Sequence, residues 1–154
     1  MIIDVASLDC EGNDFEGEEP AEVLDLGDAD EFRPLGTIKY KIRVSCAGDS
    51  VVASGVVSAE LEVECARCTE SFRLEVSDKE FAATREVANK NESIDLTPDI
   101  RESIILAFPT TPLCAPDCRG LCPQCGINLN KRECSCVIPN EDGWWSALNN
   151  LQLR

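Results

Sequence analysis

Apolar and polar residues alternate along residues 37–46 and again along residues 51–65, which predicts two half-buried strands. A turn is expected at residues 47–50, and Gly55 is expected to form a bulge or bend in the second strand. A third strand is predicted at residues 72–76. The inward positions are Ile38, Tyr40, Ile42, Val44 and Cys46, then Val57, Ala59, Leu61, Val63 and Cys65, then Phe72, Leu74 and Val76. We therefore expect an antiparallel meander, with basic side chains on the outer face of the first strand paired to glutamates of the second.

One clear helix is predicted over residues 98–108. Thr97 is a good N-cap, Pro98 suits the first helical position, and Asp99 is favoured at the positive end of the helix dipole. Pro109 is expected to end the helix. The apolar stripe of this helix consists of Ile100, Ile104, Ile105 and Phe108.

The segments that flank this helix have weaker patterns. Residues 77–95 are polar and are interpreted as irregular, with a helix over residues 79–87 as the alternative. Residues 112–139 lack periodicity and hold six cysteines. Residues 140–154 are expected to form a short C-terminal helix, centred on residues 142–151. Its apolar residues are Trp144, Trp145, Leu148 and Leu151.

Acidic residues dominate the beginning of the chain. Twelve of the 29 acidic residues lie within residues 1–32, which contain no lysine or arginine, and the formal net charge of the chain is −15. Residues 1–35 therefore form an acidic N-terminal arm in this interpretation. The arm is either a solvated, partly disordered segment or a device that docks a basic partner such as a ribosomal protein. It argues against unaided binding to phosphate groups.

The cysteine content points to metal. The chain has ten cysteines and no histidine, begins without a basic signal-peptide region, and lacks an apolar run of about 18 residues. We therefore expect a cytoplasmic protein that does not enter a membrane. Thiols stay reduced in the cytosol, so these cysteines are expected to be ligands rather than disulfides. Without histidine, a zinc site must be built from cysteine alone or from cysteine and carboxylate.

Eight cysteines have ligand spacing. Cys65 and Cys68 form a CxxC pair between two strands, and Cys122-Pro123-Gln124-Cys125-Gly126 is the CPxCG knuckle of zinc ribbons and rubredoxins. The preferred grouping predicts two sites with four ligands each, and an interleaved alternative joins Cys65 and Cys68 to Cys122 and Cys125. The preferred ligands are Cys65, Cys68, Cys114 and Cys118 at one ion, and Cys122, Cys125, Cys134 and Cys136 at the other.

Zinc is the expected metal at both sites, with iron as the alternative, since both ions accept four sulfurs in a tetrahedron. Four thiolates leave no open position for a water, so the sites are expected to be structural. The alternative is a thiol-based redox or metal-handling protein. Cys46 is expected in the core, and Cys10 as a free thiol in the acidic arm.

Catalytic motifs are missing from the sequence. There is no histidine base, no glycine-rich phosphate loop and no GxSxG motif, so we expect a protein that is not an enzyme and has no small-molecule substrate. The fold class is expected to be α+β. It combines an antiparallel sheet, as a meander or partial barrel, with one main helix in a body of residues 36–111, followed by a C-terminal cysteine-rich zinc ribbon.

Several blocks together resemble a known family. They are ECARCTESF (64–72), DLTPDIRESIILAFPTTPLC (95–114), APDCRGLCPQCGINLN (115–130) and the later CSC and DGWWSALNNL. Over about residues 36–151 the chain is similar to the YceD family, named for accumulation of large ribosomal RNA subunits. The resemblance implies a non-catalytic role in accumulation of large-subunit ribosomal RNA and thus in ribosome assembly.

The partner expected from this reading is a ribosomal protein or large-subunit ribosomal RNA. The contact would involve the acidic arm or the surface of the zinc ribbon. The ribbon residues expected to meet the partner are Arg119, Asn128, Asn130, Lys131 and Arg132.

Overall fold

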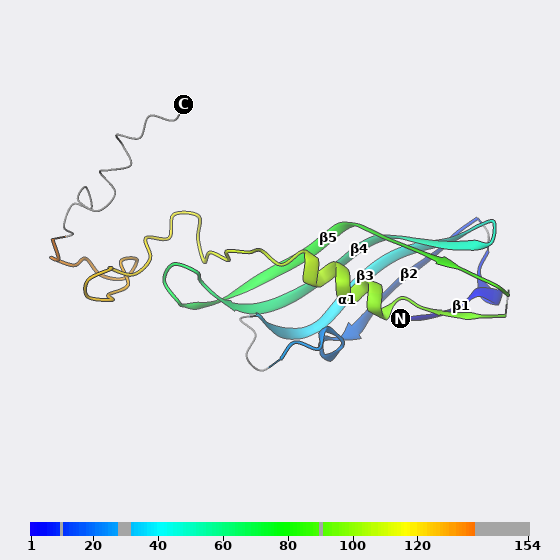
Figure 1. The fold of residues 1–154 in the computed structure, drawn as a ribbon, viewed down its shortest axis with the longest axis horizontal. Helices are drawn as coiled ribbons and strands as arrows, with labels where there is room; N and C mark the ends of the chain where they lie inside the picture. Colours follow the sequence, from blue (N-terminus) through cyan, green and yellow to red (C-terminus); the bar gives the residue numbers. More distant parts are fainter. Residues whose placement is uncertain (10, 28–31, 90, 138–154) are drawn as a thin grey trace, which may run out of the picture.

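The computed structural model describes residues 1–9, 11–27, 32–89 and 91–137. Four long strands form one antiparallel sheet in the order β2-β3-β4-β5 (Figure 1). Neighbours in the sheet are also neighbours along the chain, so the sheet is a meander, as predicted. The strands are β2 (Asn13–Pro20), β3 (Phe32–Ala47), β4 (Ser50–Glu64) and β5 (Ser71–Glu86).

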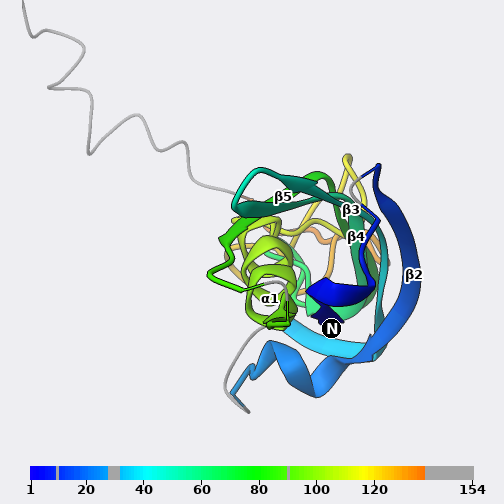
Figure 2. The same ribbon diagram turned by 90° about the vertical axis from the view of Figure 1, so that its right-hand side faces the viewer.

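A single α-helix, α1 (Thr97–Leu106), lies in the curve of this sheet within the part of the chain that the structure describes (Figure 2). Ile100 and Ile104 on α1 are 0% exposed and pack into a core with inward residues of β3 and β4. Arg85 and Asp99 form an ion pair at 2.6 Å that ties β5 to the first turn of α1. The architecture is therefore α+β, built mostly from antiparallel sheet.

Short elements close the open side of the sheet. β1 (Ile2–Asp4) pairs antiparallel with β6 (Ser93–Asp95), just before α1. The 3-10 helices η1 (Val5–Ser7) and η2 (Ala21–Leu24) place Val5 and Leu24 in the core.

Gly55 lies at a bulge between β4 and its neighbours, as predicted. The register between β4 and β5 shifts between Gly55 and Val57. A Cβ atom at Gly55 would lie 2.1 Å from the carbonyl oxygen of Lys41 on β3. Only glycine allows β4 to approach β3 this closely, at the same place where β4 forms its bulge with β5.

The interpretation of the acidic arm as a partly disordered segment is wrong for residues 13–20, because these residues form β2. The alternative, that the arm docks a basic partner, stays a prediction. β2 pairs with β3, and its acidic positions lie opposite basic ones: Asp14 opposite Arg43, and Glu16 opposite Lys41. The expected pairing with glutamates of β4 is wrong for Lys39, Lys41 and Arg43, which lie opposite Ser58, Val56 and Ser54. Two acidic residues of β2 thus form ion pairs with bases of β3 in the same chain.

The expectation that residues 77–95 are irregular or helical is wrong for residues 77–86 and 93–95, which belong to β5 and β6, and is confirmed for residues 87–89 and 91–92. β5 continues to Glu86, because Phe81 and Ala83 are buried on the inner face with the period of a strand. The alternation of apolar and polar residues is hard to recognise there, because small and polar residues occupy both faces of the strand.

Three smaller differences concern local positions. α1 runs over Thr97–Leu106, so Thr97 is its first residue and Leu96 takes the N-cap position expected for Thr97. Cys46, expected in the core, is half-buried at the end of β3. The predicted C-terminal helix and Cys10 lie outside the described residues.

The cysteine-rich segment, residues 112–137, lies beyond the end of the sheet where β4 turns into β5 (Figure 1). It contains turns and one isolated bridge, between Leu121 and Asn128. Its chain path is irregular, so a regular ribbon is not established. Across the described residues, no helix combines the length and apolar character needed to cross a bilayer.

Candidate metal centres

The first centre brings together cysteines that are far apart in the sequence. Cys65 directly follows β4 and Cys68 lies in the hairpin loop, while Cys114 and Cys118 come from the segment after α1. The four sulfur atoms lie within 4.8 Å of one another. Cys65 Sγ is 3.8 Å from Cys118 Sγ, and Cys68 Sγ is 3.7 Å from Cys114 Sγ. This matches the preferred grouping rather than the interleaved one.

The second centre gathers the cysteines of the segment's second half. Their sulfur atoms also lie within 4.8 Å of one another, and they belong to Cys122, Cys125, Cys134 and Cys136. The side-chain amide of Gln124 donates to the carbonyl of Val137 at 3.0 Å, which holds the two halves of this centre together.

These distances fit metal coordination and exclude disulfides. A metal–sulfur bond of about 2.3 Å places tetrahedral sulfurs about 3.8 Å apart, as observed in the first centre. A disulfide would require about 2.05 Å. Each group of four thiols could therefore bind one tetrahedral metal ion, and both zinc and iron fit such a site.

Both CxxC pairs have the same backbone geometry. The N–H groups of Thr69 and Gly126, one residue after each pair, donate to the carbonyl of the first cysteine at 2.9 Å. The N–H of Cys65 donates to Glu70 O at 2.9 Å, and that of Cys122 to Ile127 O at 2.8 Å. Both loops are therefore knuckles of the same kind, and in each of them backbone N–H groups of the loop also donate to the sulfur of the first cysteine.

The knuckle N–H groups control ionisation in the first centre. Burial raises the pKa of Cys65, but hydrogen bonds from the N–H groups of Cys114, Arg67 and Cys68 together lower it by more than burial raises it. The net result is a pKa of about 6. Burial, together with hydrogen bonds to Cys118, Cys68 and Cys65, raises the pKa of Cys114 to about 12. One thiol thus ionises first, and metal binding displaces protons from its neighbours.

The second centre follows the same logic. The N–H groups of Cys125 and Gln124 lower the pKa of Cys122 to about 6. The pKa of Cys136 is raised to about 12, first by its hydrogen bond to Cys125 and then by burial. The first cysteine of each knuckle is therefore the first thiolate of its centre.

The two centres are joined by Arg67, which the sequence did not single out. Its guanidinium donates to Cys118 O at 2.9 Å, and its own carbonyl accepts the N–H of Leu121 at 3.1 Å. A Cβ on Gly120, whose φ is +73°, would lie 3.0 Å from Arg67 O. The position of Arg67 between two ligands was the only signal in the sequence for this role.

The side chains of three of the five predicted partner residues form contacts within the protein. Asn130 contacts Cys118, its neighbour Asn128 accepts two hydrogen bonds from Asn130, and Lys131 forms an ion pair with Glu70. The side chains of Arg119 and Arg132 are exposed. The structure therefore assigns Asn128 and Asn130 to holding the segment together.

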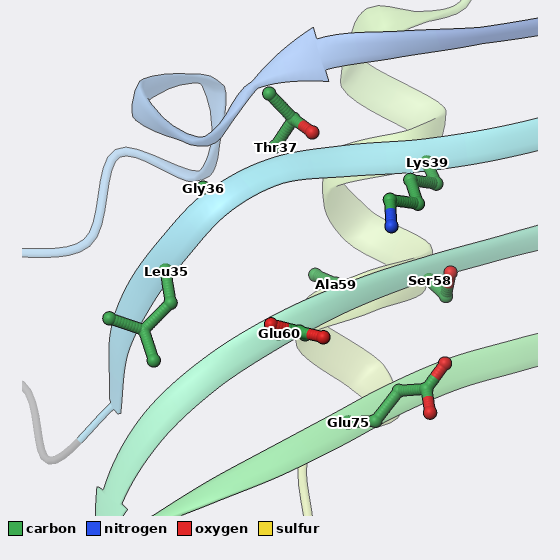
Figure 3. A pocket seen from close by; sticks show the side chains of 8 residues that line it. All are labelled: Leu35, Gly36, Thr37, Lys39, Ser58, Ala59, Glu60 and Glu75. Atoms are coloured by element: carbon green, nitrogen blue, oxygen red, sulfur yellow. The ribbon is translucent and has the colours of Figure 1, made fainter.

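A shallow hollow of about 170 Å³ lies on the outer face of the sheet, near the bulge at Gly36. Figure 3 shows Lys39, Glu60 and Glu75 at its wall, on β3, β4 and β5. Glu60 and Glu75 face each other across the strands and both are exposed to solvent.

Curated relatives cover part of the chain. An uncharacterized protein of Mycobacterium tuberculosis is 36% identical over 102 residues, which is 57% of this chain and 49% of the relative. A large ribosomal RNA subunit accumulation protein, YCED homolog 1, chloroplastic, of Arabidopsis thaliana is 38% identical over 61 residues, 40% of this chain and 19% of the relative. The alignments thus span about half or less of these relatives. No solved structure matches the chain.

The family comparison covers most of the chain. The matching family model is described as large ribosomal RNA subunit accumulation protein YceD, and it spans residues 53–152. That range contains both knuckles and all eight cysteines of the two centres. The chain therefore belongs to the YceD family.

Proposed function

We propose that this chain is a non-enzymatic, zinc-binding, cytoplasmic protein that supports accumulation of large-subunit ribosomal RNA. It acts by contact with a ribosomal protein or with precursor ribosomal RNA. The observation that carries the proposal is the family match over residues 53–152, whose description names large ribosomal RNA subunit accumulation. The name of the Arabidopsis relative supports the same role.

The metal has a structural role in this proposal. Four thiolates fill a tetrahedral ion and leave no position for substrate or water, and zinc has no redox chemistry. Ion binding at the first centre fastens residues 114–118 to the β4–β5 hairpin, and ion binding at the second closes the loop of residues 122–136. Zinc is favoured over iron because the second half of that centre is Cys134-Ser135-Cys136 rather than a second CPxCG.

The partner surface is the exposed face of the cysteine-rich segment. Arg119 and Arg132 offer positive charge there, and Leu121, Ile127 and Val137 are 37%, 37% and 83% exposed. A mixed basic and apolar surface suits a protein or an RNA loop. The net charge of −15 disfavours RNA alone, so a basic ribosomal protein is the first expected contact and RNA the second.

Purification of the tagged full chain from cell extract, with and without nuclease, tests this proposal. We expect a large-subunit ribosomal protein to copurify, and its retention after nuclease treatment would identify direct protein contact. The variant Arg119→Glu/Arg132→Glu should lose this partner. The matched variant Arg73→Glu/Lys79→Glu carries the same charge change on β5 and should keep it. Absence of ribosomal components from both preparations would refute the proposal.

A thiol redox or metal-handling function is the second candidate, favoured by the pKa of about 6 at Cys65 and Cys122. Such a function predicts reversible two-electron oxidation of Cys65 and Cys68, or rapid transfer of zinc to an acceptor. Against it, a thioredoxin-type CxxC precedes a helix, whereas β5 follows Cys68 here. Zinc that stays bound through mild oxidant and weak chelator would eliminate this candidate.

A further inference from the structure

Asn130 reaches from one centre to the other. It lies in the loop between Cys125 and Cys134, which the second centre closes. Its side-chain Nδ2 lies 3.2 Å from Sγ of Cys118, which is a ligand candidate of the first centre. Cys118 is only 4% exposed, so this amide is one of few polar groups that can meet its sulfur.

The orientation of the Asn130 amide is set by its other contacts. Its Oδ1 accepts the backbone N–H of Arg119 at 2.7 Å. A flipped amide would direct its NH₂ group against that N–H, so the nitrogen must face Cys118. Asn128 Oδ1 accepts from the backbone N–H of Asn130 at 2.9 Å and from its Nδ2 at 3.0 Å. The Nδ2 donor therefore faces Cys118 whenever the loop occupies this position.

The loop that carries Asn130 also contacts the first centre through its backbone. The N–H of Leu129 donates to Gly120 O at 2.9 Å, one residue before the contact of Asn130. Two further N–H groups, of Lys131 and Arg132, donate to Asn128 O at 3.1 Å and make the loop a tight turn. The two ends of the loop, at Cys125 and Cys134, belong to the second group of cysteines, so a metal ion bound there would fix both ends of the segment that carries Asn130.

From these contacts we infer that Asn130 is a positioning residue that couples the two metal centres. The inference rests on the proposal that both groups of cysteines bind zinc. A hydrogen bond from Asn130 stabilises the negative charge on the Cys118 thiolate, and ligand-supporting contacts of this kind change metal affinity about 10- to 100-fold. Filling the second centre fastens the loop, holds the donor against Cys118 and so tightens the first. By linkage, filling the first centre tightens the second by the same factor.

The test measures occupancy of each centre separately in the full chain. Zn²⁺ is set at a series of free concentrations with a chelator, exposed thiols are alkylated, and the cysteine peptides are quantified by mass spectrometry. In Asn130→Ala, the Zn²⁺ concentration that half-protects Cys65 and Cys114 should rise about 10- to 100-fold. Asn130→Asp, which keeps the acceptor but sets a negative oxygen against the thiolate, should raise it at least as much.

Two controls separate coupling from other effects. Lys131→Ala removes a contact from the same loop to Glu70 without touching a sulfur, and should shift the half-protection point less than threefold because exposed ion pairs are weak. Cys134→Ser/Cys136→Ser should weaken the first centre about as much as Asn130→Ala does. Adding Asn130→Ala to that background should then have little further effect, because the donor is no longer held.

Unchanged protection of Cys65 and Cys114 in Asn130→Ala and Asn130→Asp would overturn the inference. An equal effect of Asn130→Ala with and without the second centre would also overturn it, since the contact would then be local and uncoupled. A wild-type chain that shows no zinc protection at all is a different result, because it refutes metal binding itself.

Discussion

Thr69 and Gly126 occupy equivalent positions in the two knuckles. Each follows the second cysteine of a CxxC pair, and each donates its N–H to the carbonyl of the first cysteine at 2.9 Å. Thr69 has φ +56° and Gly126 has φ +70°, so both lie in the left-handed region. That region is easy for glycine and costly for a β-branched residue. The first knuckle therefore tolerates strain that the second avoids.

Thr69→Gly should stabilise the metal-loaded protein by about 1 kcal/mol. It removes the strain of a left-handed threonine in the folded protein, and this gain exceeds the extra conformational entropy that a glycine loses on folding. Gly126→Ala should destabilise it by a similar amount. No atom lies within 4 Å of the added Cβ, so strain alone would act there. Urea unfolding of the loaded protein measures both changes.

Thr84→Gly, in the extended and exposed part of β5, is the control and should destabilise the protein. If Thr84→Gly were stabilising instead, the gain at Thr69 could not be attributed to its left-handed conformation.

Cys122→Ser should remove one metal ion and unfold its loop locally, because metal-binding energy is also folding energy there. Elemental analysis should fall from two zinc ions per chain to one. Amide hydrogen exchange should become fast between Cys122 and Cys136 while the sheet stays protected. An unchanged thermal transition together with two bound ions would show that the ligand assignment is wrong.

Gly17 on β2 lies under the ring of Tyr40 on β3, its cross-strand partner. A Cβ at position 17 would lie 2.5 Å from the Tyr40 hydroxyl oxygen and 2.8 Å from Cζ. Gly17→Ala should therefore destabilise the protein by about 1–3 kcal/mol, as overpacking does elsewhere. In a Tyr40→Ala background the same substitution should cost much less. Equal costs in both backgrounds, measured by denaturant unfolding, would contradict the steric explanation.

The ion pairs between β2 and β3 should have small, salt-dependent effects. Asp14 lies 3.3 Å from Arg43 and Glu16 lies 3.5 Å from Lys41, and all four side chains are exposed. Asp14→Arg/Glu16→Lys should lower the free energy of unfolding by about 1 kcal/mol at low salt, since like charges would face each other. Reversing Arg43 and Lys41 to glutamate as well should restore it. A loss that persists in 1 M salt would point to a packing defect rather than charge.

Asp95 predicts an acid-dependent loss of stability. Hydrogen bonds from the Thr97 side chain and from its backbone N–H, the latter at 2.9 Å, lower the pKa of Asp95 in the folded protein. A lowered carboxyl pKa contributes stability above the unfolded value of about 3.9, and this contribution disappears as the pH falls through the folded value. Asp95→Ala should thus destabilise by less than about 1 kcal/mol near neutral pH, because the carboxylate is half exposed. A difference from wild type that persists unchanged below pH 3 would contradict this account.

Local patterns in the sequence predicted much of the fold. Strict alternation identified β3 and the buried face of β4, because a period of two assigns each residue to one face of a strand. The apolar stripe of Ile100 and Ile104 identified α1 in the same way. The continuation of β5 through Phe81 was missed, since small residues such as Ala82 and Ala83 give little contrast between the faces.

Ligand spacing worked equally well for the candidate site, since two cysteines three positions apart can reach one ion only through a tight local turn. The sequence by itself thus determined β3, β4, the beginning of β5, the helix and the eight sulfurs, whereas β1, β2 and β6 were not predicted. It also favoured their grouping into two sets of four, which the structure brings together.

Only the tertiary structure decided which distant segments meet. Cys68 and Cys114 come together because the chain after α1 returns to the β4–β5 hairpin, and Asn130 reaches Cys118 from the neighbouring centre. The acidic residues of β2 lie opposite bases of β3 because the two strands are neighbours in the sheet. Neither charge nor periodicity in the sequence specifies that strand order. Periodicity encodes the face on which a side chain lies, whereas its partner depends on the path of the whole chain.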